Sequence, residues 1–593
     1  MRKVLAIVEK DKCHPDKCQL ECIKYDPLNK SGGEGFHISK ETGKSTISDE
    51  VVMEMHKISA KKCPFHAIHI VNLPEKLKDD PIHRYGKNSF ELYSLPLVKE
   101  KTIVGIIGRN GIGKSSALQI LTGSVKPNLG NYEKLPEPNE IIKKYSNTWI
   151  GEYFKKLLNK EIKISYKPQR VELLTQVYKG HTVKELLKKV DERNIVKDLL
   201  HELDIESIEN RKIEELSGGE LQRVAVVAAI AKKADVYYFD EPSSFLDITH
   251  RIKAAKIIRS LAEFAAVVVI EHDLATLDYI SDEIQIVYGE PACYGIYSNS
   301  KAVRRGINDY MEGMLPEENI KFRQYSIKFS ERPIDKFVSE EVLLEFPELE
   351  KKYESFKLKT SPGKLHRGEV LAVMGANGLG KSTFLKIISG EEAPDKGKIE
   401  KIKISYKPQY LKHDIEGNVE EYLKGIAGSD FSSSWYQSNI LEKLNIQSIL
   451  QNNISELSGG ELQKVHIAAC LSKHDIDVIA MDEPSAFIDV EDRLNVAEII
   501  KDFVINKNIS AIIVDHDIQF VDYIADSMLV FEGIPAKEGH VLGTLNKREG
   551  MNKVLKTLDI TYRRDKQSGR PRINKPGSQL DQEQRHKGEH YYT

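Results

Sequence analysis

The chain has few cysteines, no long apolar run and no excess of charge of either sign. Six cysteines among 593 residues are too few for the disulfide framework of a secreted protein. Purely apolar runs such as Val224 to Ala231 and Phe264 to Ile270 fall far short of the roughly 20 residues that a membrane-spanning helix needs. Lysine and arginine number 87 against 89 aspartates and glutamates, and the resulting net charge of −2 excludes a histone-like polycation.

The other bulk properties are those of a globular chain. Hydrophobic residues make up 40% and charged residues 30%, so each domain can bury a core and stay in solution. The opening segment, MRKVLAIVEK, lacks the apolar core and cleavage site of a signal peptide. We therefore expect a soluble, cytoplasmic protein of about three or four domains that does not associate with membranes.

A long internal repeat organises the chain. Four short landmarks recur in the same order, 240 to 244 positions apart. They are ISYKPQ, ending at Gln169 and Gln409; LSGGELQ, containing Ser217 and Ser458; DEPS, beginning at Asp240 and Asp482; and HD, containing His272 and His516. Chance cannot plausibly arrange such a series, so the sequence predicts two cassettes of similar length.

A glycine-rich loop precedes each set of landmarks. GRNGIGKS (108–115) and GANGLGKS (375–382) each lie between a strand-like apolar run and a helix-like segment. This pattern is typical of phosphate-binding loops, in which backbone N–H groups and a helix N-terminus surround phosphate. We expect Lys114 and Lys381 to reach the β- and γ-phosphates, and the serine after each lysine to ligate Mg²⁺. The expected nucleotide contacts are Gly108, Asn110, Gly111, Gly113, Lys114, Ser115, Ser116, Gly375, Asn377, Gly378, Gly380, Lys381, Ser382 and Thr383.

Each DEPS landmark follows an apolar run and begins with two carboxylates. A carboxylate pair at a strand end is usually a solvated turn, but the upstream phosphate loop favours a catalytic interpretation. We expect Asp240 and Asp482 to lie in the Mg²⁺ shell, and Glu241 and Glu483 to orient or deprotonate an attacking water. A lone histidine after a strand is more often structural, yet the fixed order predicts that His272 and His516 contact the γ-phosphate.

Together these motifs resemble the nucleotide domains of ATP-binding cassette proteins, for which LSGGE is the signature. The resemblance implies two α/β cassettes in tandem, with composite sites in which one cassette's signature meets the ATP bound by the other. Lys114 would share its ATP with Ser458 and Gly460, and Lys381 with Ser217 and Gly219. Gln169 and Gln409 match the family's glutamines that contact metal and water, and Asp247 and Asp489 match its D-loops.

Four cysteines lie near the N-terminus, at Cys13, Cys18, Cys22 and Cys63. Their C-x4-C-x3-C run favours a metal site over unrelated core thiols and leaves zinc and iron–sulfur both open. Cys293 and Cys470 are expected to be plain core thiols.

The segment around these cysteines, with KKCPFHAIHIVNLP at 61–74, resembles the iron–sulfur domain of the ABC subfamily E ribosome-recycling ATPases, also called RNase L inhibitor proteins. HRYGKNSF (83–90) looks like that family's aromatic loop, with Tyr85 and Phe90 placed to stack on adenine. The segments 288–308 and 550–575 look like its two hinges.

The sequence departs from this family in its cysteine count. The family carries eight cysteines on two [4Fe–4S] clusters, but Asp26, Met53, His56 and Ser59 stand where four of them would be. In two-cluster ferredoxins the last cysteine of each run ligates the other cluster, so the four remaining cysteines belong to one cluster. We expect one [4Fe–4S] cluster retained and one lost. Zinc on the same thiolates, or a metal-free domain, are the alternatives.

Basic segments predict contacts with the ribosome. An insertion at about 136–163 is expected to form two amphipathic helices displaying Lys143, Lys144, Lys155, Lys156 and Lys160 beside Trp149 and Tyr153. In the family this element contacts ribosomal RNA, although such a charge run is usually a solvated face. Residues 551–593 hold ten lysines and arginines against five acids. We expect hinge arginines to pack against the cassettes and contact phosphate, with a disordered tail in the last dozen residues as the alternative; they are Arg304, Arg305, Arg563, Arg564, Arg570 and Arg572.

The expected domains are a ferredoxin-like α+β iron–sulfur domain (1–75), a first cassette (76–290), a hinge (291–330), a second cassette (331–540), and a second hinge with the tail (541–593). The resemblance implies an ATPase whose closure moves the N-terminal domain, on a tether between Leu73 and Arg84, to split ribosomal subunits. Its partners would be the small subunit, a release factor and initiation factors, and we expect a monomer. The alternatives are an ATP-switched regulator that inhibits a ribonuclease or scaffolds initiation factors, and the motor of a transporter.

Overall fold

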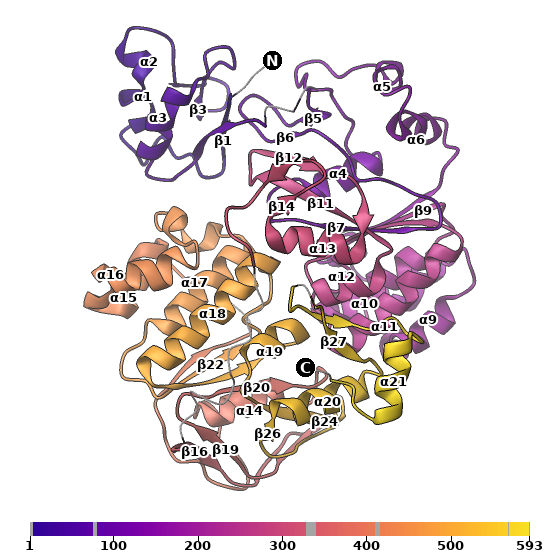
Figure 1. The fold of residues 1–593 in the computed structure, drawn as a ribbon, viewed down its shortest axis with the longest axis vertical. Coiled ribbons are helices and arrows are strands. Elements are labelled where there is room, and N and C mark those ends of the chain that lie inside the picture. The colour runs from indigo at the N-terminus through magenta and orange to yellow at the C-terminus, as the bar shows by residue number, and fades with distance from the viewer. Residues whose placement is uncertain are drawn as a thin grey trace. The chain divides into compact units, whose positions relative to one another are not determined.

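The computed structural model describes residues 4–74, 77, 80–327, 340–409, 415–566 and 568–591. They form two compact units, each treated separately below (Figure 1). The first unit comprises Met1–Ser244, Lys256–His272 and Ile280–Ser326, and the second comprises Phe245–Ala255, Asp273–Tyr279 and Ile327–Thr593. No helix in the described ranges combines the length and apolar character needed to cross a membrane.

The first unit begins with a small α+β domain. Strand β1 (Val4–Val8) pairs antiparallel with β4 (Ile68–Asn72). β1 is apolar throughout, and β4 directs Ile68 and Ile70 into a core that contains Phe36 and Ile47. The chain between these strands forms α1 (Glu21–Lys24), α2 (Pro27–Lys30), the hairpin of β2 (His37–Ile38) and β3 (Ser45–Thr46), and α3 (Lys57–Lys62).

A nine-stranded sheet forms the body of the first unit. Its order is β5-β6-β12-β11-β7-β10-β9-β8, with β13 added beside β11. The central strands run parallel, and β7 and β10 are apolar throughout, since helices cover both faces of such sheets. The strands are β5 (His83–Arg84), β6 (Glu91–Leu92), β7 (Ile103–Ile107), β8 (Ile164–Lys167), β9 (Val236–Asp240), β10 (Ala266–Ile270), β11 (Glu283–Glu290), β12 (Tyr294–Tyr297) and β13 (Lys301–Ala302).

The second unit repeats this sheet strand for strand. Its order is β17-β18-β25-β24-β20-β23-β22-β21, with β26 added beside β24, and this equivalence confirms the predicted tandem α/β cassettes. The strands are β17 (Leu349–Lys352), β18 (Lys357–Thr360), β20 (Val370–Met374), β21 (Ile404–Lys407), β22 (Val478–Asp482), β23 (Ser510–Val514), β24 (Ser527–Ile534), β25 (Glu538–Val541) and β26 (Leu545–Asn546). The pair β16 (Val342–Phe346) and β19 (Gly363–His366) forms a separate two-stranded sheet.

Corresponding helices follow corresponding strands in the two cassettes (Figure 1). The helices that position the sites are α4 (Lys114–Leu121), α10 (Gly218–Ala231), α11 (Ile248–Ser260), α12 (Leu274–Ile280), α14 (Lys381–Ile388), α17 (Gly459–Leu471), α18 (Val490–Lys507) and α19 (Ile518–Ile524). Cys293 and Cys470 are buried core thiols, as predicted.

The insertion in the first cassette forms two helices, as predicted: α5 (Pro138–Lys144) and α6 (Trp149–Leu158). The five lysines predicted to be displayed there are exposed. The prediction that Tyr153 is displayed beside them is wrong, because this side chain is buried and its hydroxyl lies 2.8 Å from the Leu121 carbonyl oxygen and 2.7 Å from the Tyr238 hydroxyl. Tyr153 therefore anchors the insertion to the cassette.

The C-terminal segment is ordered, which contradicts the alternative of a disordered tail. Helix α21 (Gln579–Lys587) follows the hairpin β27 (Tyr562–Arg564) and β28 (Pro571–Ile573), and Tyr591 is buried against Asp522.

Two arginines of this segment correct the predicted phosphate contacts. Arg570 and Arg572 are buried, and both bind the carboxylate of Asp278, Arg572 with Nε–Oδ2 and Nη2–Oδ1 distances of 2.7 and 2.8 Å. An arginine held by a buried carboxylate offers no surface to nucleic acid.

The predicted tether from Leu73 to Arg84 lies partly outside the described residues, as does the predicted boundary between the first hinge and the second cassette near residue 330. At the far end of the tether, Arg84 is buried and binds Asp49 and Glu91 at 2.7 and 3.0 Å.

Candidate nucleotide-binding and iron–sulfur sites

The first phosphate loop connects the buried strand β7 to α4. Gly113 caps α4 with φ +86°, and a Cβ added there would lie 2.6 Å from the ring of Phe90, so only glycine fits. Lys114 Nζ donates to the carbonyl oxygens of Gly108 and Arg109 at 2.9 and 2.7 Å. These bonds place the ammonium inside the loop, where phosphate oxygens can replace the carbonyl oxygens.

The second loop has the same construction. Gly380 caps α14 with φ +91°, and Lys381 Nζ donates to the carbonyl oxygens of Gly375 and Ala376 at 2.9 and 2.8 Å. Ser382 Oγ donates to Asp482 Oδ2 at 2.6 Å, so two of the predicted Mg²⁺ ligands of this site meet.

The carboxylate of Asp240 ends β9 and is 1% exposed. The side chains of Ser115 and Tyr166 lie against this carboxylate as hydrogen-bond partners. Burial and the neighbouring charge of Glu241 raise its pKa to about 6. A buried carboxylate beside the serine hydroxyl of the phosphate loop fits a cation, so the residues present suit a magnesium ion at this strand end.

Glu241 lies beside two other predicted catalytic groups of the first cassette. Gln169 Nε2 donates to its Oε1 at 2.6 Å, and His272 Nε2 lies 3.4 Å from the same oxygen. Burial opposes ionisation of Glu241, but the bond from His272 and the charges of His272 and Lys114 outweigh it and lower the pKa to about 2. The carboxylate is therefore ionised at neutral pH.

The second cassette repeats this arrangement closely. Gln409 Nε2 donates to Glu483 Oε1 at 2.7 Å, and His516 Nε2 lies 3.4 Å from that oxygen. Burial is again outweighed by His516 and Lys381, and the pKa of Glu483 falls to about 2.

Sequence reasoning missed the residues that shape the turn at each glutamate. Glu241 has φ +48°, and Lys167 Nζ and Gln222 Nε2 donate to its carbonyl oxygen at 3.0 and 2.7 Å. Lys407 and Gln463 occupy the equivalent positions and donate to the carbonyl oxygens of Asp482 and Glu483. All four belong to the repeated ISYKPQ and LSGGELQ landmarks, and that repetition was the available signal.

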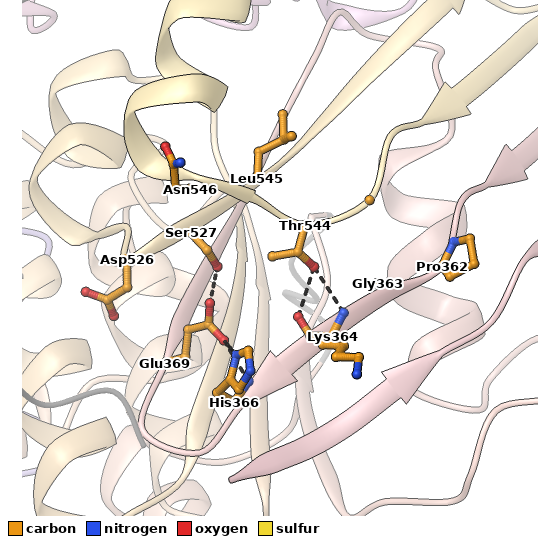
Figure 2. A pocket seen from close by; sticks show the side chains of 11 residues that line it. Pro362, Gly363, Lys364, His366, Glu369, Asp526, Ser527, Thr544, Leu545 and Asn546 are labelled. Carbon is orange, nitrogen blue, oxygen red and sulfur yellow. Dashed lines mark hydrogen bonds and ion pairs between the residues drawn. The ribbon is translucent and has the colours of Figure 1, made fainter. Parts of the chain in front are cut away.

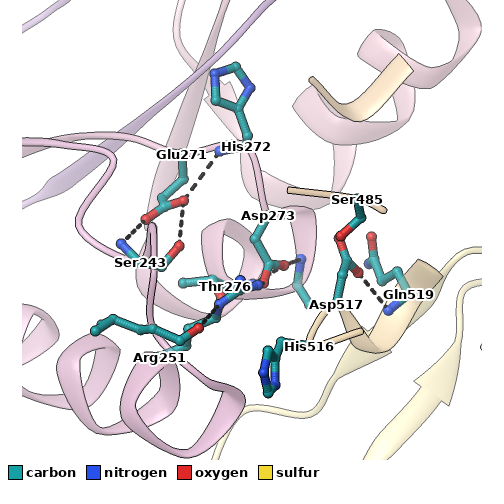
Figure 3. A network of polar contacts seen from close by, with 12 residues as sticks. Ser243, Arg251, Glu271, His272, Asp273, Thr276, Ser485, His516, Asp517 and Gln519 are labelled. Carbon is teal, nitrogen blue, oxygen red and sulfur yellow. Dashed lines mark hydrogen bonds and ion pairs between the residues drawn. The ribbon is translucent and has the colours of Figure 1, made fainter. Parts of the chain in front are cut away.

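The serine of each DEPS landmark fixes the residue before the histidine. Ser243 donates through its N and Oγ to Glu271, both at 2.9 Å, and Ser485 does the same to Asp515 at 3.0 and 2.7 Å. Figure 3 shows Ser243 and Glu271 beside His272. These bonds hold the strand ends that carry the two histidines.

Each signature serine caps a helix. Ser217 Oγ accepts from the backbone N–H of Glu220 while the Glu220 side chain accepts from the Ser217 backbone N–H, which is a capping box at the start of α10. Ser458 and Glu461 form the same box on α17. The free N–H groups at the start of each helix therefore lie in the signature loop itself, as an anion-binding role requires.

One D-loop contact lies within the second unit. Asp247 Oδ2 accepts from the backbone N–H of Asn377 in the second phosphate loop at 2.8 Å, while Oδ1 accepts from His250 Nδ1 at 2.8 Å. The predicted D-loop residue of one cassette thereby contacts the phosphate loop of the other.

Aromatic residues lie ahead of each phosphate loop, and only one pair was predicted. Tyr85 is 48% exposed, and Phe90 packs against Gly113. Tyr353, 43% exposed, and Phe356, packed against Gly380, are the equivalents in the second cassette. The backbone N–H of each tyrosine donates to the carbonyl oxygen of its phenylalanine. Tyr353 and Phe356 were missed because their loop is shorter and its sequence differs.

The four N-terminal cysteines line a single small cavity. Burial raises the pKa of all four thiols, that of Cys22 to about 11. Backbone N–H groups lie against the sulfurs, with Ser45 N 3.5 Å from Cys13 Sγ. Such donors stabilise thiolates that ligate a cluster.

The cavity suits a metal centre held by thiolates, because the four cysteine side chains surround one small space. Such thiolates ligate zinc and iron–sulfur clusters alike, so both interpretations fit the residues of the cavity.

A pocket in the second unit contains none of the predicted site residues. In this pocket, Glu369 accepts from the Ser527 hydroxyl and lies 3.0 Å from His366 Nδ1 (Figure 2). Glu369 is thus engaged with its own neighbours, and we assign the pocket no part in nucleotide binding.

Comparisons with known proteins show the family of the chain. The ABC transporter family matches residues 96–244 and 358–486, and the possible Fer4-like domain in RNase L inhibitor matches residues 4–34. An uncharacterized ABC transporter ATP-binding protein of Methanocaldococcus jannaschii is 48% identical, covering 99% of this chain and 97% of that protein. Translation initiation factor RLI1 of Saccharomyces cerevisiae is 40% identical, with coverages of 99% and 98%.

Solved structures extend the similarity to the whole fold. A model of ribosome-bound archaeal Pelota and ABCE1 matches with a TM-score of 0.92 and 46% identity, covering 100% of this chain and 99% of that one. The complex of an archaeal ribosomal stalk protein with the archaeal recycling factor aABCE1 matches with a TM-score of 0.83 over 88% of this chain. The chain belongs to subfamily E of the ATP-binding cassette proteins, the RNase L inhibitor family.

Proposed function

We propose that the protein is an ATPase that splits ribosomal subunits after termination. The observation that carries this proposal is the duplication of a complete hydrolytic centre, since Glu241 and Glu483 each lie against a glutamine and a histidine. A protein that used ATP only as a ligand would not need an ionised carboxylate in both sites. The relatives include translation factors and ribosome-bound proteins.

In the proposed mechanism, Lys114 and Lys381 bind the β- and γ-phosphates, and Tyr85 and Phe90 stack on adenine. Magnesium, when bound, neutralises phosphate charge. Its proposed ligands are Ser115, Gln169 and Asp240 in the first site, and Ser382, Gln409 and Asp482 in the second.

The carboxylates of Glu241 and Glu483 accept a proton from the attacking water, and His272 and His516 hold the γ-phosphate. Ser217 and Ser458, with Gly219 and Gly460, complete the opposite cassette's site. ATP therefore favours closure, and hydrolysis reopens the clamp.

We propose a single [4Fe–4S] cluster on Cys13, Cys18, Cys22 and Cys63. The common cavity and the backbone donors around the sulfurs support this assignment. The cluster supplies rigidity to the domain that moves during splitting. We also propose the domain boundaries at about 75, 290, 330 and 540.

The proposed partners are the ribosome and a release factor or a Pelota-like protein. The exposed lysines of α5 and α6 support contact with ribosomal RNA, and the solved relatives bound to a stalk protein and to the ribosome support the remainder. We propose that the protein acts as a monomer in the cytoplasm, and that initiation factors bind it after splitting.

The test separates an enzyme from an ATP-switched regulator. Purified protein is incubated with small subunits and ATP, and both bound protein and released phosphate are measured. The proposal predicts ATP-dependent binding with phosphate release that disappears in the double variant Lys114→Ala/Lys381→Ala. ATP-dependent binding without any phosphate release would instead support the regulator.

A further inference from the structure

Three of the four residues that replace the missing cysteines meet inside the N-terminal domain. Asp26, His56 and Ser59 are each 0% exposed. His56 Nδ1 lies 2.7 Å from Asp26 Oδ2, and Ser59 Oγ donates to the same oxygen at 3.0 Å. The fourth residue, Met53, is 51% exposed and takes no part in this network.

The hydrogen bonds fix the charge of the network. Asp26 Oδ1 accepts from the backbone N–H groups of Leu28 and Asn29, both at 3.0 Å, so the carboxylate accepts from four donors. His56 Nε2 lies 3.0 Å from the Val51 carbonyl oxygen, which can only accept. Both ring nitrogens of His56 therefore donate, and the pair is an imidazolium beside a carboxylate.

The electrostatics of Asp26 agree with this assignment. Burial alone would raise its pKa, but the bonds from His56, Asn29 and Ser59 lower it below the ordinary value. A buried ion pair is stable when every donor and acceptor is satisfied, as here.

The network joins the chain segments that a second cluster would have joined. Asp26 caps α2, His56 ends the short helical turn Glu54–His56, and Ser59 lies on α3. We propose that the ion pair Asp26–His56, with Ser59, replaces the second iron–sulfur cluster as the crosslink between these segments. One half of the domain is then held by a cluster and the other half by protein groups alone.

Other uses of the three side chains conflict with the geometry. Ser59 donates to Asp26 rather than to His56, and its hydroxyl is buried, so it cannot act as a nucleophile activated by histidine. Both nitrogens of His56 are engaged, so neither is available to a metal ion. A second cluster would lack a cysteine thiolate at all four positions.

The experiment uses the full-length protein, purified without oxygen. Iron and sulfide are counted per chain, and hydrogen exchange is followed by mass spectrometry in peptides covering 26–36 and 51–62. Asp26→Asn keeps the side-chain shape but removes the charge, and Glu50→Gln, at an exposed neighbouring carboxylate, is the matched control.

We expect about four irons in wild type and in both variants. Exchange in the two peptides should be at least about 100-fold faster in Asp26→Asn and unchanged in Glu50→Gln, because the variant leaves a buried imidazolium without its counter-charge. If Asp26→Asn does not fold, Ser59→Ala removes one donor only and should accelerate exchange about fivefold to tenfold. Unchanged exchange in a folded Asp26→Asn protein, or in Ser59→Ala where only that variant folds, would overturn the proposal.

This inference rests on the proposed single cluster. The iron count tests the cluster and the hydrogen exchange tests the ion pair, so failure of one can be told from failure of the other. About eight irons in wild type would overturn both. Four irons with unchanged exchange would overturn the inference alone. An iron-free protein with accelerated exchange in Asp26→Asn would leave the network in place and remove the proposed cluster.

Discussion

Replacement of both catalytic glutamates by glutamine tests the hydrolytic centres. In Glu241→Gln/Glu483→Gln each amide keeps the shape of the carboxylate, and its oxygen can still accept from Gln169 or Gln409. The amide cannot take a proton from water. The expected defect is therefore in the chemical step and not in folding or in ATP binding.

The size of the defect follows from the contribution of general-base catalysis. Loss of a positioned base costs about 10²- to 10⁴-fold in rate, which corresponds to about 3 to 5 kcal/mol in the barrier. Both carboxylates have a pKa of about 2, so wild type is fully ionised throughout neutral pH and the whole effect should appear at pH 7.

The assay is steady-state phosphate release with ATP in excess, alongside ATP binding and thermal unfolding of the same proteins. Glu400→Gln, at an exposed position outside any helix or strand, is the control and should behave as wild type. Turnover in the double variant within a factor of three of wild type would refute the assignment of both glutamates. A lower unfolding temperature with weaker ATP binding would show that they act structurally.

Three further substitutions test individual parts of the account. Tyr353→Ala should weaken ATP binding at the second site about tenfold, because base stacking is worth about 1–3 kcal/mol, while Tyr353→Phe should not; equal affinities by nucleotide titration would contradict stacking. Tyr153→Phe removes hydrogen bonds to Leu121 and Tyr238 and should lower the unfolding free energy by about 1–2 kcal/mol in denaturant titrations. An unchanged unfolding free energy would mean that these bonds do not anchor the insertion. Cys63→Ser should reduce bound iron from about four to near zero, and full retention would exclude Cys63 as a ligand.

The repeated motifs allowed the cassettes and most of the site to be predicted from sequence. Phosphate loops and signatures are local patterns whose function follows from adjacent residues, so Lys114, Glu241 and Ser217 could be named from the printed letters. The distances between these side chains could not be predicted from the sequence, because only the fold brings β7, β9 and α10 together.

The errors arose where long-range contacts decide the role of a side chain. The basic C-terminal segment predicts a surface position for Arg572, but Asp278, which is 294 positions away, binds this side chain in the interior. Tyr153 reads as part of a basic surface, but the Tyr238 hydroxyl draws it into the core. The sequence shows that Asp26 stands where the family has a cysteine ligand, but the ion pair of Asp26 with His56 can be seen only in the folded structure.

Splitting of post-termination ribosomes tests the central claim most directly. Light scattering of ribosomes carrying a release factor is recorded after addition of the protein with ATP, with ADP or without nucleotide. The account predicts a fall in scattering to the level of free subunits with ATP only, and no fall with Lys114→Ala/Lys381→Ala. Constant scattering with ATP and wild-type protein, in a sample that binds ribosomes and releases phosphate, would contradict it.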